Sequence, residues 1–136
     1  MLTTKKVWVN GTFDILHRGH IELFKFARNQ GDYLSVGIDT DRRIKEKKGK
    51  NRPVNTQLDR KYFLEAIKYI DEVVIFDSAT ELINLVAHHQ PDFMVVGEEY
   101  KNKEVIGGTH AKEIKYFRKI GEYSTTKILQ NSFSGR

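Results

Sequence analysis

The run Gly-Thr-Phe-Asp-Ile-Leu-His-Arg-Gly-His at residues 11–20 joins an apolar strand pattern to an amphipathic helix pattern. Helical spacing places His17 and His20 on one side of the first turn, where unpaired backbone N–H groups and the helix dipole attract anions. Gly11 and Gly19 let the backbone approach a ligand without an intervening Cβ. The run therefore indicates a phosphate site. The alternative is a buried histidine pair that caps a helix.

Apolar runs alternate with helical patterns along the chain, as in a parallel, doubly wound α/β sheet. Strands are expected at residues 7–9, 33–38, 73–76 and 93–96, and helices at about 19–29 and after the caps Thr56 and Ser78. The buried stripes of the last two helices are expected to be Phe63, Ala66, Ile67 and Ile70, and then Leu82, Ile83 and Val86. Gly31 is expected to end the first helix as a C-terminal glycine.

Four segments each follow a strand, and parallel strands end at a common edge where open α/β sheets bind ligands. These segments are residues 10–20, 39–50, 97–100 and 124–127. We therefore expect them to converge on one site.

At 136 residues the chain fits a single domain, expected at residues 1–131 and followed by a flexible tail at residues 132–136. It has no cysteine, which excludes disulfides, thiolate catalysis and zinc–sulfur sites. Neither a signal peptide pattern nor a membrane-spanning apolar run is present, so we expect a cytoplasmic protein without a membrane partner.

Six lysines and arginines fall between Arg42 and Lys50, within a chain of formal net charge +5. This clustering favours a loop that closes over a triphosphate, with a solvated basic loop as the alternative. Nucleic-acid binding would depend on charge alone, because neither an aromatic-rich sheet motif nor a zinc finger accompanies the run. No nucleic-acid partner is therefore expected.

Residues 11–20 resemble the Gly-Thr-Phe-Asp-x-x-His-x-Gly-His signature of the cytidylyltransferase-like nucleotidyltransferases, and the likeness extends from Lys6 to about Leu129. Members of that family join a nucleoside monophosphate from CTP or ATP to a phosphorylated small-molecule acceptor and release pyrophosphate. The resemblance implies a single-domain, Rossmann-like α/β fold with a doubly wound, parallel five-stranded sheet. It also implies a homodimer, and Mg²⁺ as a cofactor held largely by phosphate oxygens and water.

The region after the fourth strand allows two interpretations. An apolar residue at every third position from Ala111 to Phe117 fits one face of a helix, whereas alignment of a later Ser-Thr-Thr run with the family makes residues 113–117 a fifth strand. We predict the strand, preceded by a short helix or turn at residues 103–107. A last short helix is expected at residues 125 to about 130.

Nucleotidyl transfer needs no general base, because a phosphate monoester is largely dianionic near neutral pH and is already a nucleophile. The barrier lies in charge repulsion and in the migration of charge to the leaving pyrophosphate. Cations and hydrogen-bond donors held in fixed positions lower that barrier. The histidines, lysines and arginines of the motifs suit this chemistry.

By resemblance, His17 and His20 are catalytic residues that bind the triphosphate and stabilise charge at the α-phosphate. The nucleotide site is expected to be lined by Gly11, Thr12, Phe13, Asp14, Gly19, Arg60, Gly97, Ser124, Thr125 and Thr126. Asp14 either forms a turn or cap, or orients a histidine or lysine. Arg60 either binds phosphate through two nitrogens or forms a surface ion pair.

Lysines of the basic run are candidates for the lysine that family members bring to the phosphates. They are Lys45, Lys47 and Lys48, of which Lys45 and Lys48 are predicted to be catalytic. Lys48 matches best, because it stands in a Lys-Gly pair followed by Arg-Pro-Val-Asn at residues 52–55. The Ser-Thr-Thr run at residues 124–126 matches the start of the family's last helix, where hydroxyl and N–H groups favour phosphate.

No protein metal site is predicted. The adjacent His88 and His89 point in different directions on a helix and are expected at the surface. Asp39, at the end of a predicted strand, is expected to bind the acceptor or to help position Mg²⁺.

Two branches of the family resemble this chain most. Heptose 1-phosphate adenylyltransferases resemble the chain at Arg-Pro-Val-Asn and at Glu-Val-Ile-Gly, residues 104–107. The chain has Gly-Glu-Glu-Tyr at residues 97–100 where they carry Gly-Gly-Asp-Tyr. Glycerol-3-phosphate cytidylyltransferases share Gly-Thr-Phe-Asp at residues 11–14. We predict transfer from ATP to a sugar 1-phosphate like D-glycero-D-manno-heptose 1-phosphate. The CTP-dependent enzyme and a non-catalytic nucleotide-binding sensor are the alternatives.

Overall fold

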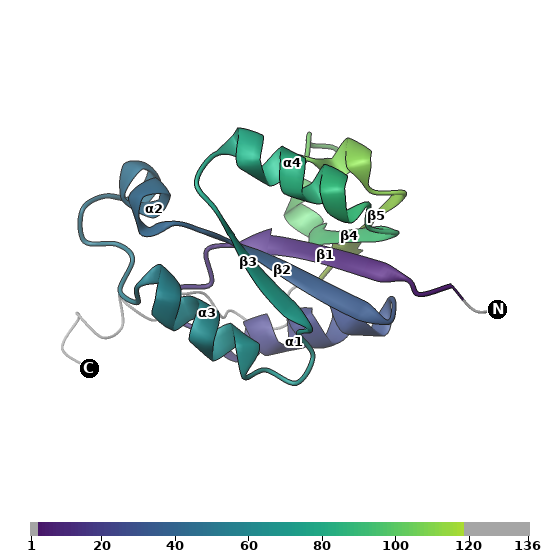
Figure 1. Ribbon diagram of the computed structural model, residues 1–136, viewed down its shortest axis with the longest axis horizontal. Helices are drawn as coiled ribbons and strands as arrows, with labels where there is room; N and C mark the ends of the chain where they lie inside the picture. Colours follow the sequence, from purple (N-terminus) through teal and green to yellow (C-terminus); the bar gives the residue numbers. More distant parts are fainter. Residues whose placement is uncertain (1–2, 119–136) are drawn as a thin grey trace.

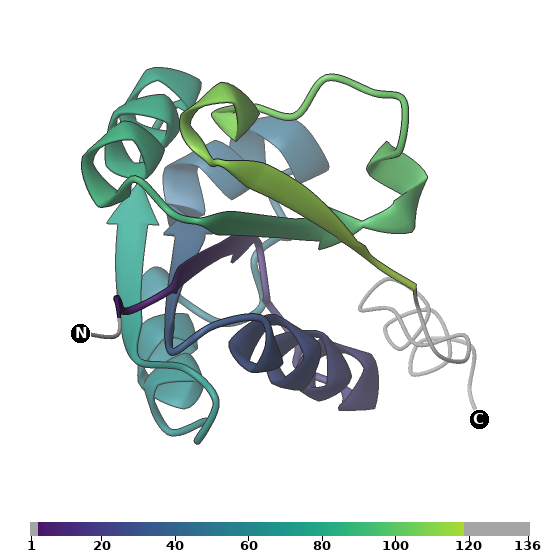
Figure 2. The same ribbon diagram turned by 90° about the vertical axis from the view of Figure 1, so that its right-hand side faces the viewer.

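The computed structural model describes residues 3–118, which form a five-stranded parallel sheet in the order β3-β2-β1-β4-β5 (Figures 1 and 2). The strands are β1 (Lys6–Gly11), β2 (Tyr33–Asp39), β3 (Glu72–Phe76), β4 (Phe93–Gly97) and β5 (Glu113–Phe117). The α-helices are α1 (Arg18–Asn29), α2 (Asp41–Lys48), α3 (Gln57–Glu65) and α4 (Ala79–His89), and the 3-10 helices are η1 (Glu98–Tyr100) and η2 (Gly108–His110). The predicted Rossmann-like α/β class is confirmed.

Helices cover both faces of the sheet, as a doubly wound fold requires (Figure 1). On the face covered by α1 and α3, Phe24 and Leu64 join the larger apolar cluster. On the opposite face, Leu82 and Val86 of α4 pack against the fully buried Trp8. The interior strand β2 lies between β3 and β1 and is buried at six of its seven positions, which include Leu34, Val36 and Ile38.

The loop predicted for the basic run is wrong, because residues Asp41–Lys48 form the helix α2. The hydroxyl of Thr40 caps this helix by accepting a hydrogen bond from the backbone N–H of Arg43. An acidic first turn and a basic last turn also suit the helix dipole. Ile44 is the only buried residue of α2, so the apolar stripe that reveals most helices is missing.

The end of α1 also differs from the prediction. Its C-cap is Gln30 in the right-handed region, and the left-handed glycines among the described residues are Gly49 and Gly107. A Cβ on Gly31 would lie 2.6 Å from the carbonyl oxygen of Lys5. Glycine at position 31 therefore allows the backbone after α1 to pass close to the backbone at Lys5. It does not adopt the left-handed conformation expected of a helix C-terminal glycine.

The buried faces of α3 and α4 are narrower than predicted. In α3, Arg60 and Leu64 are buried, whereas Phe63 is 44% exposed and Ala66 lies beyond the helix. In α4, Ile83 is 37% exposed. A buried arginine carries no apolar signal, so sequence periodicity assigned the inner face of α3 to the wrong residues.

The fifth strand is confirmed, since β5 pairs with β4 in parallel along its whole length. Of the short helix or turn expected at residues 103–107, the structure has a turn at residues 106–107, and the 3-10 helix η2 follows it. Within residues 3–118, no helix is long and apolar enough to cross a membrane. The predicted last helix and the predicted tail lie outside the described residues.

Candidate active site

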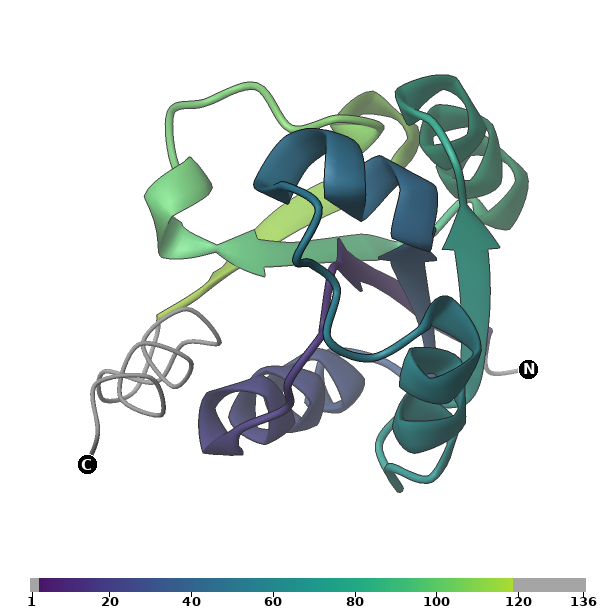
Figure 3. The ribbon, with the colours of Figure 1, turned by 90° about the vertical axis from the view of Figure 1, so that its left-hand side faces the viewer.

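A cavity of about 490 Å³ opens at the carboxyl ends of the central strands. It lies at β1 and β4, between which the strand order changes direction, and this is the place where open α/β sheets bind ligands. Figure 3 looks toward this edge, with α2 across the strand ends and the segment after β4 arching beside it. The lining residues are Val9, Asn10, Gly11, Thr12, Phe13, Leu23, Asp39, Arg43, Ile44, Lys47, Lys48, Phe76, Leu82, Val95, Val96, Gly97, Tyr100, Glu104, Val105 and Ile106.

The predicted convergence is confirmed for the three segments that the structure describes. Of the predicted site residues, Gly11, Thr12, Phe13, Asp39, Lys48 and Gly97 line the cavity. The predicted Ser124, Thr125 and Thr126 lie outside the described residues, and their role stays a prediction.

The histidine pair stands at the start of α1. His17 is the N-cap residue, and its ring stacks on that of His20 with centroids 3.8 Å apart. The backbone N–H of His17 donates to Nδ1 of His20 at 3.2 Å. Because Nδ1 accepts this bond, a neutral His20 carries its proton on Nε2, which is then a donor for an anion. Gly19 lies between the two, in the first turn of the helix.

Phe13 connects the histidine pair to the cavity. Its ring lines the cavity and meets the edge of His20, with ring centroids 5.4 Å apart. Its backbone is left-handed, with φ of 48°, a conformation that is uncommon outside glycine and often marks a functional site. A Cβ on Gly11 would lie 2.9 Å from the Phe13 ring, so Gly11 makes room for that ring as well as lining the cavity.

Asp14 fastens the segment after α2 to the turn before the histidines. Asp14 is 2% exposed, and its carboxylate accepts hydrogen bonds from the backbone N–H groups of Val54 and Asn55, each at 2.8 Å. Arg52 Nε approaches the same carboxylate at 3.3 Å. The side chain of Asn55 returns a hydrogen bond to the Asp14 carbonyl oxygen at 2.7 Å. Asp14 thus holds the loop at residues 52–55 in place. Neither predicted role, a turn or cap residue or a group that orients a histidine or lysine, describes these contacts fully.

Arg60 lies inside the protein, where the surface ion pair considered for it does not occur. Its side chain is fully buried and its nitrogens donate to the Asn55 carbonyl oxygen at 3.1 Å, the Thr12 carbonyl oxygen at 3.0 Å and Asp41 Oδ1 at 2.9 Å. These contacts join α3 to the turn after β1 and to the start of α2. A direct contact between Arg60 and a nucleotide stays a prediction.

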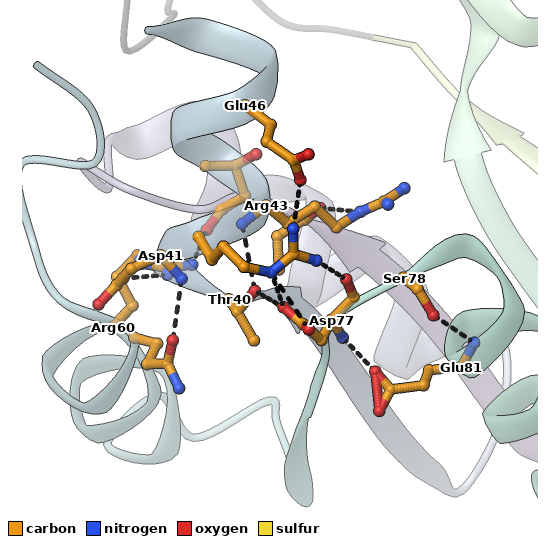
Figure 4. A network of polar contacts seen from close by, with 12 residues as sticks. Thr40, Asp41, Arg43, Glu46, Arg60, Asp77, Ser78 and Glu81 are labelled. Atoms are coloured by element: carbon orange, nitrogen blue, oxygen red, sulfur yellow. Dashed lines mark hydrogen bonds and ion pairs between the residues drawn. The ribbon is translucent and has the colours of Figure 1, made fainter. Parts of the chain in front are cut away.

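The beginning of α2 is fixed by a network of polar contacts (Figure 4). The hydroxyl of Thr40 donates to Asp77, and Arg42 Nε donates to the same carboxylate at 3.0 Å. The hydrogen bond from Thr40 and that from Arg42 hold the pKa of Asp77 below its ordinary value. Gln57 at the start of α3 also accepts the backbone N–H of Asp41 at 2.9 Å. Anchored at this end, α2 carries its lysines to the cavity.

The lysines of α2 take different positions. Lys47 and Lys48 line the cavity, and neither forms a hydrogen bond or ion pair with another residue of the described range 3–118. Lys45 is not part of the wall, and its Nζ donates to the carbonyl oxygen of Arg52 at 3.3 Å. Desolvation and the nearby Arg52 guanidinium lower the pKa of Lys48. Geometry therefore favours Lys48 and Lys47 for binding phosphate, and a catalytic role for Lys45 stays a prediction.

Asp39 faces the cavity but has a partner in the protein. Its carboxylate accepts Arg43 Nε at 2.8 Å, and both side chains are largely buried. Among the described residues, no group of three or more His, Asp or Glu side chains is placed to hold a metal ion.

His89 is not the surface residue that was predicted. Its side chain is 17% exposed, with Nδ1 at 2.8 Å from the Leu85 carbonyl oxygen and Nε2 at 2.8 Å from Glu72. His88 is exposed, as predicted. The two rings lie in a different part of the fold from the cavity.

Sequence reasoning missed several residues of the site. Arg43 and Glu104 line the cavity, and Arg52 contacts Asp14. The resemblance through Arg-Pro-Val-Asn marked the segment of Arg52 without giving that arginine a role. The resemblance to heptose 1-phosphate adenylyltransferases marked residues 104–107 without giving Glu104 a role, since its position in the cavity wall depends on how the segment after β4 folds back.

Comparison with known proteins decides the family. The model of the family described as cytidylyltransferase-like matches residues 8–131. This chain belongs to the cytidylyltransferase-like family. Membership of this family makes it a nucleotidyltransferase, as the resemblance through the histidine motif predicted.

Curated relatives include the bifunctional protein HldE of several bacteria. The protein from Campylobacter fetus is 46% identical over 123 residues, which are 90% of this chain and 27% of the relative. That from Nitratiruptor is 44% identical over 126 residues, 91% of this chain and again 27% of the relative. This cytidylyltransferase-like chain thus spans about a quarter of the length of these relatives.

Solved structures share the fold. A lipopolysaccharide core biosynthesis protein from Thermoplasma volcanium superposes with a TM-score of 0.68 at 26% identity, covering 90% of this chain and 100% of that protein. A pantothenate synthetase from Thermus thermophilus has a TM-score of 0.63 at 14% identity over 91% of this chain and 61% of that protein. The second likeness concerns the fold alone.

Proposed function

We propose that this nucleotidyltransferase transfers AMP from ATP to a sugar 1-phosphate like D-glycero-D-manno-heptose 1-phosphate and releases pyrophosphate. The observation that carries the proposal is the stacked pair His17 and His20 at a helix N-terminus, beside a cavity that two lysines line. Two likenesses support the choice of acceptor: the resemblance to heptose 1-phosphate adenylyltransferases, and the 46% sequence identity to HldE of Campylobacter fetus over 123 residues. The likeness to a lipopolysaccharide core biosynthesis protein supports it further.

In this reaction an oxygen of the acceptor phosphate attacks the α-phosphorus of ATP, and the bond from that phosphorus to the pyrophosphate oxygen breaks. The backbone N–H groups at the start of α1 and the Nε2–H of His20 donate to the triphosphate. Lys48 and Lys47 offset the charge that two phosphorylated substrates bring together. None of these residues removes a proton, because the acceptor is already ionised.

Mg²⁺ would lower the repulsion between the phosphates. The donor set of the cavity suits a metal held mainly by phosphate oxygens and water, because it is rich in cations and its carboxylate Asp39 is paired with Arg43. Asp39 is the residue that would approach such an ion or the acceptor.

A CTP-dependent transferase acting on glycerol 3-phosphate is the second candidate, favoured by Gly-Thr-Phe-Asp at residues 11–14. Pyrophosphate release with Mg²⁺ separates the two when ATP and CTP are each tested against heptose 1-phosphate, other sugar 1-phosphates and glycerol 3-phosphate. Release with ATP and a sugar 1-phosphate supports the proposal. Release with CTP and glycerol 3-phosphate alone contradicts it, and nucleotide binding without release would support a sensor.

The location and partners predicted from the sequence remain part of this proposal: a cytoplasmic protein that binds neither membrane nor nucleic acid and, by the resemblance, forms a homodimer. The exposed apolar side chains of α3, Leu58 at 71% and Tyr62 at 72% exposure, offer a surface for a second copy. Light scattering of the purified protein would report the mass of a dimer. The Tyr62→Glu variant is expected to give the monomer mass.

A further inference from the structure

We propose that Glu104 selects a sugar as the acceptor by accepting hydrogen bonds from its hydroxyl groups. The inference rests on the transferase function proposed above and assigns one wall of the same cavity. Glu104 lines that cavity and has no hydrogen bond or ion pair with another residue in the described part of the chain.

The cavity reaches both faces of the sheet. Toward α1 it is bounded by Phe13 and Leu23, which belong to or pack on the apolar cluster of that face. Toward α4 it is bounded by Leu82 and Val105, which belong to or pack on the opposite cluster. The histidine pair stands at the start of α1, so the triphosphate occupies the α1 side. The α4 side is then left for the acceptor.

The charges around the cavity are unevenly distributed. Asp39 and Arg43 neutralise each other at 2.8 Å. On the α2 wall neither Lys47 nor Lys48 forms an ion pair within the described range, although Asp39 and Asp14 lie near enough to Lys48 to attract its charge. The wall formed by the segment after β4 carries the carboxylate of Glu104. A carboxylate repels phosphate, so the phosphate of the acceptor belongs near the lysines and its neutral part near Glu104.

The backbone around Glu104 is well anchored. The next residue, Val105, packs on the cluster that contains Val86, and its carbonyl oxygen accepts the N–H of Gly108 at 3.0 Å. Gly107 is left-handed, and a Cβ there would lie 3.2 Å from a methyl group of Val86. These contacts fix the segment on α4 and hold Glu104 on the cavity wall.

An ionised carboxylate can accept hydrogen bonds from two neighbouring hydroxyl groups, which are abundant on a sugar. Such charge-assisted bonds are stronger than bonds between neutral groups. Glu104 is exposed to solvent in the free protein, so its carboxylate is hydrated until an acceptor binds. Losing one charge-assisted hydrogen bond lowers affinity by about 10- to 100-fold. Glu104 therefore favours an acceptor that carries neighbouring hydroxyl groups over one that lacks them, and a sugar offers more such pairs than a smaller acceptor does.

Steady-state kinetics of the Glu104→Gln and Glu104→Ala variants test this inference, with ATP and the sugar 1-phosphate varied separately. We expect KM for the sugar 1-phosphate to rise about 10-fold or more, while KM for ATP stays within about twofold of wild type. The control is Glu65→Gln, an exposed residue of α3 outside the cavity wall. With a deoxy-sugar 1-phosphate that lacks the contacted hydroxyl, the difference in KM between wild type and the Glu104 variants should be smaller.

Two failures can be told apart. A wild-type protein that binds ATP but releases no pyrophosphate with any sugar 1-phosphate would overturn the transferase function, and this inference with it. Release by wild type with an unchanged KM for the sugar 1-phosphate in both variants would overturn the inference alone. An equal rise in KM for ATP would also contradict it, because it would place Glu104 at the nucleotide.

Discussion

The imidazole rings of His17 and His20 lie nearly parallel, with centroids 3.8 Å apart and an angle of 24° between their planes. Two positive rings at this distance would repel each other unless an anion lay beside them. The hydrogen bond from the His17 backbone to His20 Nδ1 orients the second ring in its neutral form. The pair is thus arranged to receive an anion at the helix N-terminus.

Removing either ring should abolish most of the activity without unfolding the protein. We expect His17→Ala and His20→Ala each to lower kcat by about 100-fold or more, the usual cost of losing a donor that stabilises transition-state charge. Pyrophosphate release and the urea midpoint measure the two effects. The control is His110→Ala, an exposed residue outside the cavity wall. Activity near wild type in both histidine variants would contradict the assigned role.

The contacts of Asp14 predict that its replacement by alanine lowers the free energy of unfolding. Asp14→Ala leaves the N–H groups of Val54 and Asn55 and the Arg52 guanidinium without their acceptor, at a cost of about 3 kcal/mol. Urea unfolding followed by the fluorescence of Trp8, the single tryptophan, measures it. The exposed Asp59→Asn is the control. A change of less than about 1 kcal/mol would show that the loop does not depend on Asp14.

The lysines of α2 can be ranked by substitution. Lys48→Met and Lys47→Met should each lower kcat/KM by about 10-fold or more, because each removes a cation from the cavity wall. Lys45→Met, which removes a bond to a carbonyl oxygen at the surface, should change it by about threefold or less. An effect of Lys45→Met as large as that of Lys48→Met would restore Lys45 as a catalytic lysine.

Stability should depend on pH through Asp92, which joins the starts of β1 and β4. The hydrogen bond from the backbone N–H of Lys6, at 2.8 Å, and the ammonium of Lys112 lower the pKa of Asp92. A carboxyl group with a lowered folded-state pKa stabilises the protein above its unfolded-state pKa of about 4. That stabilisation is lost as the pH falls through the folded-state value.

Asp92→Asn should therefore be less stable than wild type at pH 7 and approach it as the pH falls below about 4. Urea unfolding of both proteins across this range measures the difference. The Asp59→Asn control should show no such convergence. A stability difference that does not change with pH would mean that the charge of Asp92 contributes nothing.

The fold could be predicted where burial leaves a repeating pattern. β2 is covered on both faces, and its Leu34, Val36 and Ile38 supply the apolar residues that mark the strand in the sequence. α2 lies over the strand ends and buries Ile44 alone, so composition indicated a loop. Its helix depends on a cap at Thr40 and on contacts with Asp77, which is distant in sequence.

The site was predictable where a motif carries the chemistry, and less so where its geometry depends on distant contacts. His17 and His20 follow from a contiguous run. The burial of Arg60 depends on acceptors at Thr12 and Asp41, 48 and 19 residues away in sequence. Glu104 reaches the cavity because the segment after β4 folds back on α4. Short-range patterns contain neither relationship.

The central claim is that the bond broken lies at the α-phosphorus of ATP. Phosphorus NMR of a reaction mixture of the protein, Mg²⁺, ATP and D-glycero-D-manno-heptose 1-phosphate tests it most directly. We predict a diphosphate-linked ADP-sugar and an equal amount of free pyrophosphate. Formation of ADP with a doubly phosphorylated sugar, or an unchanged mixture alongside turnover of CTP with glycerol 3-phosphate, would contradict the account.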